Sequence, residues 1–292
     1  MAIEKIELED GTFECHVANY SEIEEAFNDT TISKAYLDCD IDCNDYGVNF
    51  EWSINRTSDI VFDLCKHTIK NIMIKKDCDL FNTSKGYIYV SNGKILNVFN
   101  NIAKHIAYRT IFENVSLSIN ANNVTDTSFY KCAFNCCTMY YESSKLNNNL
   151  WEGAIDSSIK NSDIYLKIND VNNKILFNYN SLAPGVGVID GSRIRGKVEI
   201  NSNVDYLLSN KAIINSVINL EIPEYKSEST QLKLVNNGSY LISTGVINTE
   251  IINNGDDSTY DVGDVITKCN SSFLSDGDWL NINGFAVAQI QN

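Results

Sequence analysis

The chain has 292 residues, of which 43% are hydrophobic and 21% charged, so it can bury a large core and is not a disordered polypeptide. A formal net charge of −15 and an isoelectric point near 4.6 argue against nucleic acid as a partner, because phosphate binding requires a positive surface. No run is long and apolar enough to cross a bilayer, so we also expect no membrane partner.

The N-terminal residues and the cysteines indicate where the protein is made. The first residues, MAIEKIELEDG, lack the cationic stretch and apolar run of a secretion signal. The nine cysteines are odd in number and repeat no zinc-ligand spacing, so we expect reduced thiols and no disulfide framework. Both observations predict synthesis in a cytoplasm, without a signal peptide.

The first predicted element is a short helix. Ser21 followed by Glu24 is the pattern of a capping box at a helix N-terminus. The apolar face that follows consists of Ile23, Ala26 and Phe27. We expect this helix to end near Asn28 and, with a strand before it, to complete an N-terminal unit over residues 1–36.

The next stretch, YLDCDIDC (36–43), alternates like a strand with one buried face. The inward positions are Leu37, Cys39, Ile41 and Cys43, and the outward ones are Asp38, Asp40 and Asp42. In a strand the two cysteines lie about 13 Å apart, too far to share a zinc ion, so we interpret both as small core residues. The aspartates form a solvated row or, with carboxylates of a neighbouring strand, a calcium site.

Most of the chain beyond this point consists of short strands that resemble one another. The clearest are TIFENVSLSIN (110–120), TSFYKCAFNCC (127–137), DSSIKNSDIYLKIN (156–169), DGSRIRGKVEIN (190–201) and AIINSVINLEI (212–222). Each has an apolar residue, a polar corner and then an alternating strand. Self-similarity at roughly 20 to 35 residues is typical of a solenoid, whose coils bury their inner faces against each other.

Asparagine is abundant at the predicted corners. It tolerates left-handed backbone conformations, and stacked in successive coils its amide can form a hydrogen-bonded ladder. The helix before Asn28 is then the cap that blocks the open end of the solenoid.

These features together resemble a known superfamily. The cap helix, the strand YLDCDIDC and rungs such as SFYKCAFNCC are similar to the pectate-lyase-like parallel β-helices, in particular to those of bacteriophage spikes and fibres. The resemblance covers residues 15–252. It implies an all-β fold: a right-handed parallel β-helix (solenoid) with a short N-terminal capping helix and a small C-terminal β region.

The C-terminal segment differs from the rungs. After residue 252, short strands are joined by Gly-Asp and Asp-Gly turns, with Trp279 and Phe285 as expected anchors. We therefore expect a parallel β-helix over 37–252 and a β module or cap over 253–292. The C-terminal module either registers a trimer or forms a lid on the same solenoid.

Catalytic motifs of the superfamily do not transfer to this chain. Polygalacturonase-like relatives imply Asn-Thr-Asp, Asp-Asp, Gly-His-Gly and Arg-Ile-Lys in that order. Here Arg193-Ile194-Arg195 is similar to the last, but Asn248-Thr249-Glu250 follows it and no Gly-His-Gly exists. Lyase chemistry needs a basic residue and a cation at the substrate carboxylate, and Arg193 or Arg195 beside Asp190 are the candidates for part of that site. The alternative is that this arginine and aspartate form a surface ion pair. We expect no cofactor.

Exposed aromatic residues are the other functional candidates. Tyr140, Tyr141 and Trp151 follow the cysteine-rich rung and a polar asparagine stretch. Exposed rings on a β-helix can stack on sugars, or they can pack on their own loops.

The function expected from these features is that of a non-enzymatic structural appendage of a bacteriophage virion: a fibre, spike or decoration protein. We expect a homotrimer, because flat faces of a β-helix can associate about a threefold axis. Other virion proteins and host-surface glycans are the expected partners. Two alternatives remain: a tail spike that binds or depolymerises polysaccharide, and a bacterial carbohydrate-active β-helix enzyme.

Overall fold

The computed structural model describes the chain from residue 3 to residue 200 almost continuously, and beyond it the strands alone. The described residues are 3–46, 52–54, 56–74, 77–100, 104–122, 124–153, 158–171, 175–179, 188–200, 206–209, 212–214, 217–222, 233–235, 241–242, 246–251, 279–282 and 285–289. They contain one α-helix, α1 (Tyr20–Asn28), and a separate 3₁₀ turn at Cys43–Tyr46. No helix in these ranges is long and apolar enough to span a membrane.

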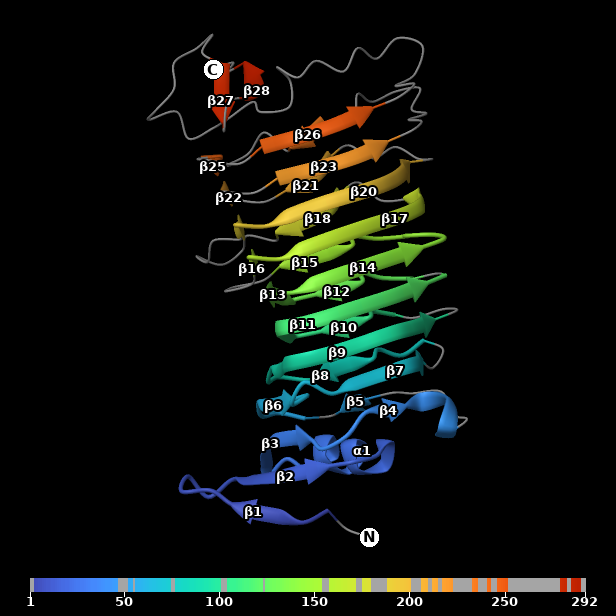
Figure 1. Ribbon diagram of the computed structural model, residues 1–292, viewed down its shortest axis with the longest axis vertical. Helices are drawn as coiled ribbons and strands as arrows, with labels where there is room; N and C mark the ends of the chain where they lie inside the picture. Colours follow the sequence, from blue (N-terminus) through green and yellow to red (C-terminus); the bar gives the residue numbers. More distant parts are fainter. Residues whose placement is uncertain are drawn as a thin grey trace.

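The chain climbs as a right-handed parallel β-helix, with the near strands of Figure 1 running from left to right as the coil rises. The long sheet contains β1 (Lys5–Glu7), β2 (Phe13–Val17), β3 (Ile32–Leu37), β4 (Ile41–Asp42), β6 (Ile60–Asp63), β7 (Thr68–Met73), β9 (Ile88–Asn100), β11 (Thr110–Ala121), β13 (Ala133–Asn135), β14 (Thr138–Ser143), β16 (Ser158–Lys160), β17 (Asp163–Val171), β19 (Val188–Asp190), β20 (Arg193–Ile200), β22 (Ala212–Ile214), β23 (Val217–Ile222), β25 (Leu241–Ile242) and β26 (Val246–Ile251). The second sheet takes one strand from each coil: β5 (Trp52–Ile54), β8 (Phe81–Thr83), β10 (Ala107–Tyr108), β12 (Phe129–Tyr130), β15 (Trp151–Gly153), β18 (Ile175–Tyr179), β21 (Tyr206–Ser209) and β24 (Lys233–Val235).

The repeated segments lie side by side in parallel register, which confirms the predicted solenoid. One inward column, read from coil to coil, is Phe112, Phe134, Ile159 and Ile189. Side chains that are hydrogen-bonded to each other between successive coils are 21 to 32 residues apart, as the sequence spacing predicted. Each inward residue therefore packs on its equivalent in the next coil, so the core is one continuous stack along the axis.

One corner of the solenoid turns through a left-handed residue in five successive coils. These residues have φ between 48° and 57° and are Asn92, Asn114, Cys136, Asn161 and Gly191. The Asn114 amide donates to the Asn92 side-chain oxygen at 3.2 Å, and at another corner Asn97 donates to Asn71 at 3.1 Å. The asparagine ladders predicted from composition are therefore present.

The N-terminal helix covers the first coil, and its buried face consists of Ile23, Ala26 and Phe27, as predicted. Its N-cap is Asn19, however, and not Ser21. The Asn19 side chain accepts from the Glu22 N–H at 3.1 Å, and the Glu22 carboxylate accepts from the Ala18 N–H at 2.7 Å. The predicted capping box was thus two residues late, because asparagine serves as a cap equally well and starts the helix earlier.

The YLDCDIDC stretch is a corner between two strands and not one continuous strand. β3 ends at Leu37, β4 begins at Ile41, and Cys43 opens the 3₁₀ turn. Cys43 is buried, as predicted, but Cys39 is half-buried and its thiol donates to the Ala18 carbonyl at 3.2 Å. The core position assigned to Cys39 was wrong, because the alternation continues in sequence across a bend that changes where the side chains point.

The C-terminal region contains an antiparallel hairpin, β27 (Trp279–Ile282) with β28 (Phe285–Gln289). The two predicted anchors lie in its strands, at Trp279 and Phe285. The remainder of 253–292 lies outside the described residues.

Candidate functional site

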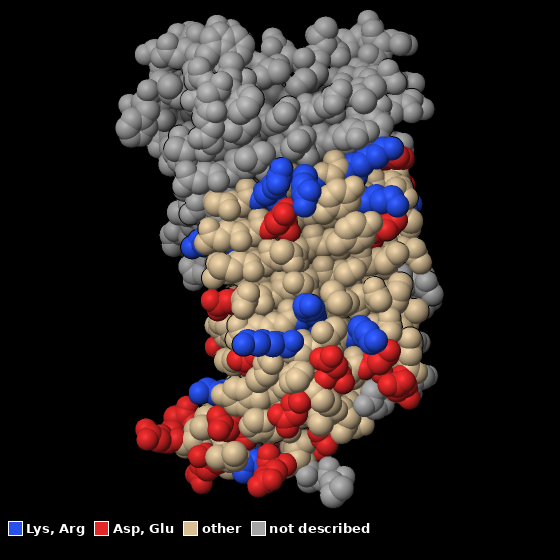
Figure 2. All heavy atoms as spheres, in the orientation of Figure 1, with Lys and Arg blue, Asp and Glu red and all other residues tan. Residues whose placement is uncertain are grey.

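A shallow groove of about 560 Å³ crosses the outward face of the long sheet. The strands of this sheet lie at the front of Figure 1. It runs over β9, β11, β14, β17 and β20, and its lining residues are Leu96, Ser116, Leu117, Ser118, Thr138, Met139, Tyr140, Asp163, Tyr165 and Arg195. This volume lies within the range of small-ligand sites. In Figure 2 the same face carries lysine and arginine side chains near its upper end, whereas acidic side chains gather towards the N-terminus.

Strand alternation and parallel register build the groove from two columns of outward side chains. The first column, across β11, β14, β17 and β20, is Ser118, Tyr140, Tyr165 and Arg195. The second is Ser116, Thr138, Asp163 and Arg193. Because neighbouring coils are about 4.8 Å apart, residues of one column are held at near stacking distance by the backbone itself.

The two tyrosines of the first column form a parallel stack. The Tyr140 and Tyr165 ring centroids are 5.4 Å apart with 6° between the ring planes. The Arg195 guanidinium lies 5.9 Å from the Tyr165 centroid and covers that end of the stack. Tyr140 remains 39% exposed and Tyr165 36%, so a rigid aromatic surface faces solvent.

Ion pairs fix both sides of this stack. Arg195 Nε and Nη2 donate to the two Asp163 carboxylate oxygens, each at 3.2 Å. The Tyr140 hydroxyl donates to Glu142 at 3.0 Å, and the Lys167 ammonium lies 2.7 Å from the other oxygen of that carboxylate. The hydrogen bond from Lys167 holds the pKa of Glu142 below its usual range, while burial and then Glu142 raise the pKa of the Tyr140 hydroxyl.

The predicted lyase candidates lie on two strands, Asp190 on β19 and both Arg193 and Arg195 on β20. Arg195 pairs with Asp163 of the preceding coil, which supports the surface ion pair. Arg193 is exposed and lies in register with Asp163. Asp190 belongs to β19, on the other side of the Gly191 corner, where its backbone pairs with Lys160 and its side chain lies outside the described residues.

Only one of the three predicted surface aromatics is exposed. Tyr140 lies in the groove, but Tyr141 is fully buried and its hydroxyl is hydrogen-bonded to Ser128 at 2.8 Å. Trp151 is also buried, and its indole donates to the Cys132 carbonyl at 2.7 Å. Adjacent strand residues face opposite ways, so Tyr140 and Tyr141 could never both be outward. Sequence reasoning missed Tyr165, whose signal was its place in the repeat beside Tyr140.

The predicted aspartate row is outward but paired with basic or amide groups of neighbouring coils. Asp38 contacts His16 at 2.6 Å, Asp40 contacts the Thr68 N–H at 2.8 Å, and Asp42 contacts Lys70 at 3.2 Å. The neighbouring coils thus supply hydrogen-bond donors to these aspartates and not the extra carboxylates of a calcium site. Within the described ranges, no three His, Cys, Asp or Glu residues group closely enough to hold a metal ion.

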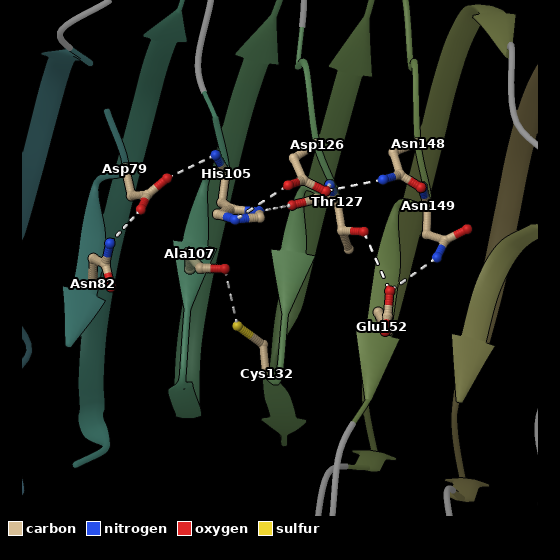
Figure 3. Close-up of polar contacts among 10 residues, drawn as sticks. All are labelled: Asp79, Asn82, His105, Ala107, Asp126, Thr127, Cys132, Asn148, Asn149 and Glu152. Carbon is tan, nitrogen blue, oxygen red and sulfur yellow. Dashed lines mark hydrogen bonds and ion pairs between the residues drawn. The ribbon is translucent and has the colours of Figure 1, made fainter. Parts of the chain in front are cut away.

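A second polar cluster lies at the start of the short strands and is shown in Figure 3. Its central column is almost fully buried and consists of Asp79, His105, Thr127 and Asn149. The backbone N–H of His105 donates to the Asp79 carboxylate at 2.7 Å, and the ring nitrogen Nδ1 of His105 lies 2.6 Å from the Thr127 carbonyl oxygen. Because that carbonyl can only accept, Nδ1 carries the proton, and Nε2 faces Asp126 at 3.8 Å.

This column links four successive coils through buried hydrogen bonds. Burial raises the pKa of Asp79, and the Asn82 amide donates to the same carboxylate at 2.6 Å. Further along, Asn148 donates to Asp126, and Asn149 to Glu152. Asp79, His105 and Thr127 are thus each hydrogen-bonded to a neighbouring coil, which is the role of a structural latch.

Comparison of the chain with protein-family models, with curated proteins and with solved structures found no match in any of the three. The class of protein is therefore defined by its fold, a parallel β-solenoid with a helical cap, and by its site, a groove lined by aromatic rings and hydroxyls.

Proposed function

We propose that this protein is a non-enzymatic structural appendage of a bacteriophage particle, a fibre, spike or decoration protein whose long sheet contacts a glycan on the host surface. The observation that carries the proposal is the chemistry of the groove. Its carboxylate, Asp163, is neutralised by Arg195, so a ligand meets tyrosine rings and hydroxyls. A surface of this kind binds sugars by stacking and hydrogen bonding.

The ionisable groups beside the groove also favour binding over catalysis. A general acid needs a pKa near the working pH, whereas the Lys167 ammonium keeps Glu142 ionised by lowering its pKa. Glycoside hydrolysis requires one carboxyl group that keeps a proton. The pairing of Glu142 with Lys167 works against that state.

The phage setting and the trimer are supported by the repeat pattern and by the shape of the coil. The asparagine-rich rungs and the capping helix are the features that resemble phage spikes and fibres. We include in the proposal that the chain is related to the pectate-lyase-like superfamily. Stacked coils give flat faces along the solenoid, which can associate side by side about a threefold axis.

The first test is the mass of the purified protein by light scattering. We expect a value near three times 32.8 kDa. A clean monomer of 32.8 kDa would contradict the trimeric appendage.

The second test is an assay of reducing ends released from host capsular polysaccharide. We expect no release by the wild-type protein. Release that is abolished by Asp163→Asn would replace the proposal with a depolymerising spike.

A further inference from the structure

The stack of tyrosines in the groove is open at one end. Tyr165 covers one face of the Tyr140 ring, and no other aromatic ring among the described residues lies on the opposite face. That face is directed along the column towards β11, where the in-register residue is Ser118. One coil further, Leu96 of β9 closes the gap, and all three residues line the groove.

The size of this gap follows from the coil spacing. With about 4.8 Å between coils, the Tyr140 and Leu96 levels are about 9.6 Å apart, because the small Ser118 occupies the level between them. A flat ring in van der Waals contact on both faces needs about 7 to 8 Å, at about 3.5–4.0 Å per contact. We propose that the slot between Tyr140 and Leu96, with Ser118 as its floor, binds one pyranose ring of a polysaccharide chain.

The polar groups around the slot suit a sugar. Beside Ser118, the second column presents the hydroxyls of Ser116 and Thr138, which are hydrogen-bonded to each other at 2.9 Å. Hydroxyls both donate and accept, as the hydroxyl groups of a pyranose do. The apolar C–H face of the ring then lies on Tyr140.

The aromatic wall of the slot is held in place before any ligand arrives. Lys167 fixes Glu142, which accepts from the Tyr140 hydroxyl and fixes the rotation of the ring. On the far side, Asp163 fixes Arg195, which covers Tyr165. Binding of a sugar ring in the slot therefore loses little side-chain entropy, because these side chains are already ordered.

The test uses calorimetric titration of the full-length protein with four soluble hexasaccharides: cellohexaose, maltohexaose, chitohexaose and hexagalacturonate. We expect at least one to bind the wild type. Ser118→Tyr adds the next ring to the existing stack and fills the slot, so binding should be lost while the fold is kept. Tyr140→Ala removes the stacking face and should weaken binding about tenfold, the effect of one aromatic contact.

Two matched variants separate the slot from general effects. Ser118→Ala keeps the slot open and should bind within about twofold of the wild type, since it loses one hydroxyl of a solvated site. Tyr89→Ala removes a half-buried tyrosine of β9 that does not line the groove and should bind like the wild type. Failure of all four hexasaccharides to bind the wild type, or unchanged binding by Ser118→Tyr, would overturn the inference.

This site deepens the proposed function and rests on it for the polysaccharide, but the two fail separately. If the protein is a monomer and binds a hexasaccharide through the slot, the binding site is supported and the trimeric appendage is contradicted. If Ser118→Tyr and Tyr140→Ala change the mass by light scattering while no hexasaccharide binds, the face belongs to self-association and the slot is refuted.

Discussion

At the scale of single residues, Arg56 joins the cap helix to the solenoid. Its side chain is buried, and within the described part of the chain its donors reach backbone carbonyls alone: those of Ala26, Phe27, Asp29, Ile32, Ser58 and Asp59. The last carbonyls of a helix have no partner within the helix. Arg56 therefore completes the C-terminus of α1 and ties the cap to the first coils of the solenoid.

Replacing Arg56 by Met should lower the free energy of unfolding by about 3 kcal/mol, because several buried carbonyls lose their donor at once. Urea unfolding followed by circular dichroism measures the change. Arg193→Met is the matched control, since Arg193 is exposed on β20 and its loss should cost no more than about 0.5 kcal/mol. Equal stability of the Arg56 variant and this control would contradict the role of Arg56 as a helix cap.

At the scale of elements, corner residues decide where each strand ends. Four of the five left-handed positions at the Asn92 corner are asparagine or glycine, the residues that adopt positive φ most readily. The fifth, Cys136, interrupts the amide ladder between Asn114 and Asn161 and is exposed. At the other four positions of this corner, the residue is one that favours the left-handed conformation.

Cys136→Asn should restore the ladder and raise the free energy of unfolding by about 0.5–1 kcal/mol, within the usual gain from a favourable turn substitution. Thermal and urea unfolding measure the gain. Cys136→Ala removes the thiol without adding an amide, and it should not stabilise because alanine tolerates positive φ poorly. A gain in the Ala variant as large as in the Asn variant would mean that the thiol, and not the missing ladder, is responsible.

At the scale of the whole molecule, the cap determines where the solenoid begins. α1 covers the end of the core, where the Phe27 ring packs edge-on against Phe62 at 5.3 Å between centroids. β1 pairs antiparallel with β2, so the first coil offers no free parallel edge of β2 on that side. A solenoid without such a cap exposes both its core and its strand edges to other chains.

Phe27→Ala should therefore lower the free energy of unfolding by about 3–5 kcal/mol and cause association that increases with protein concentration. Light scattering at several concentrations, together with thermal unfolding, measures both effects. Phe99→Ala is the control, because Phe99 is 37% exposed on β9 and lies away from the cap. A Phe27 variant that loses stability but scatters like the wild type would show that the helix fills the core without guarding the open end.

Sequence alone was sufficient for the solenoid, for the buried face of the cap helix and for the asparagine ladders. Each depends on residues close in the chain or on a repeat that brings equivalent residues together, as with Phe112 and Phe134. It was not sufficient for Cys39, because the period-2 alternation continued across a bend between β3 and β4. The predicted position of the capping box was also wrong, since both Asn19 with Glu22 and Ser21 with Glu24 match the pattern of a helix start.

The candidate site was decided by the tertiary structure. Tyr140 was predicted as a surface aromatic, but its partners Tyr165 and Ser118 come from the coils on either side, and their register depends on the length of every intervening loop. Arg195 likewise pairs with Asp163, 32 residues earlier and in the preceding coil. Composition and periodicity thus determined that the chain coils. Only the stacking of the coils determined which side chains meet, because contacts between coils depend on three-dimensional register and not on distance along the sequence.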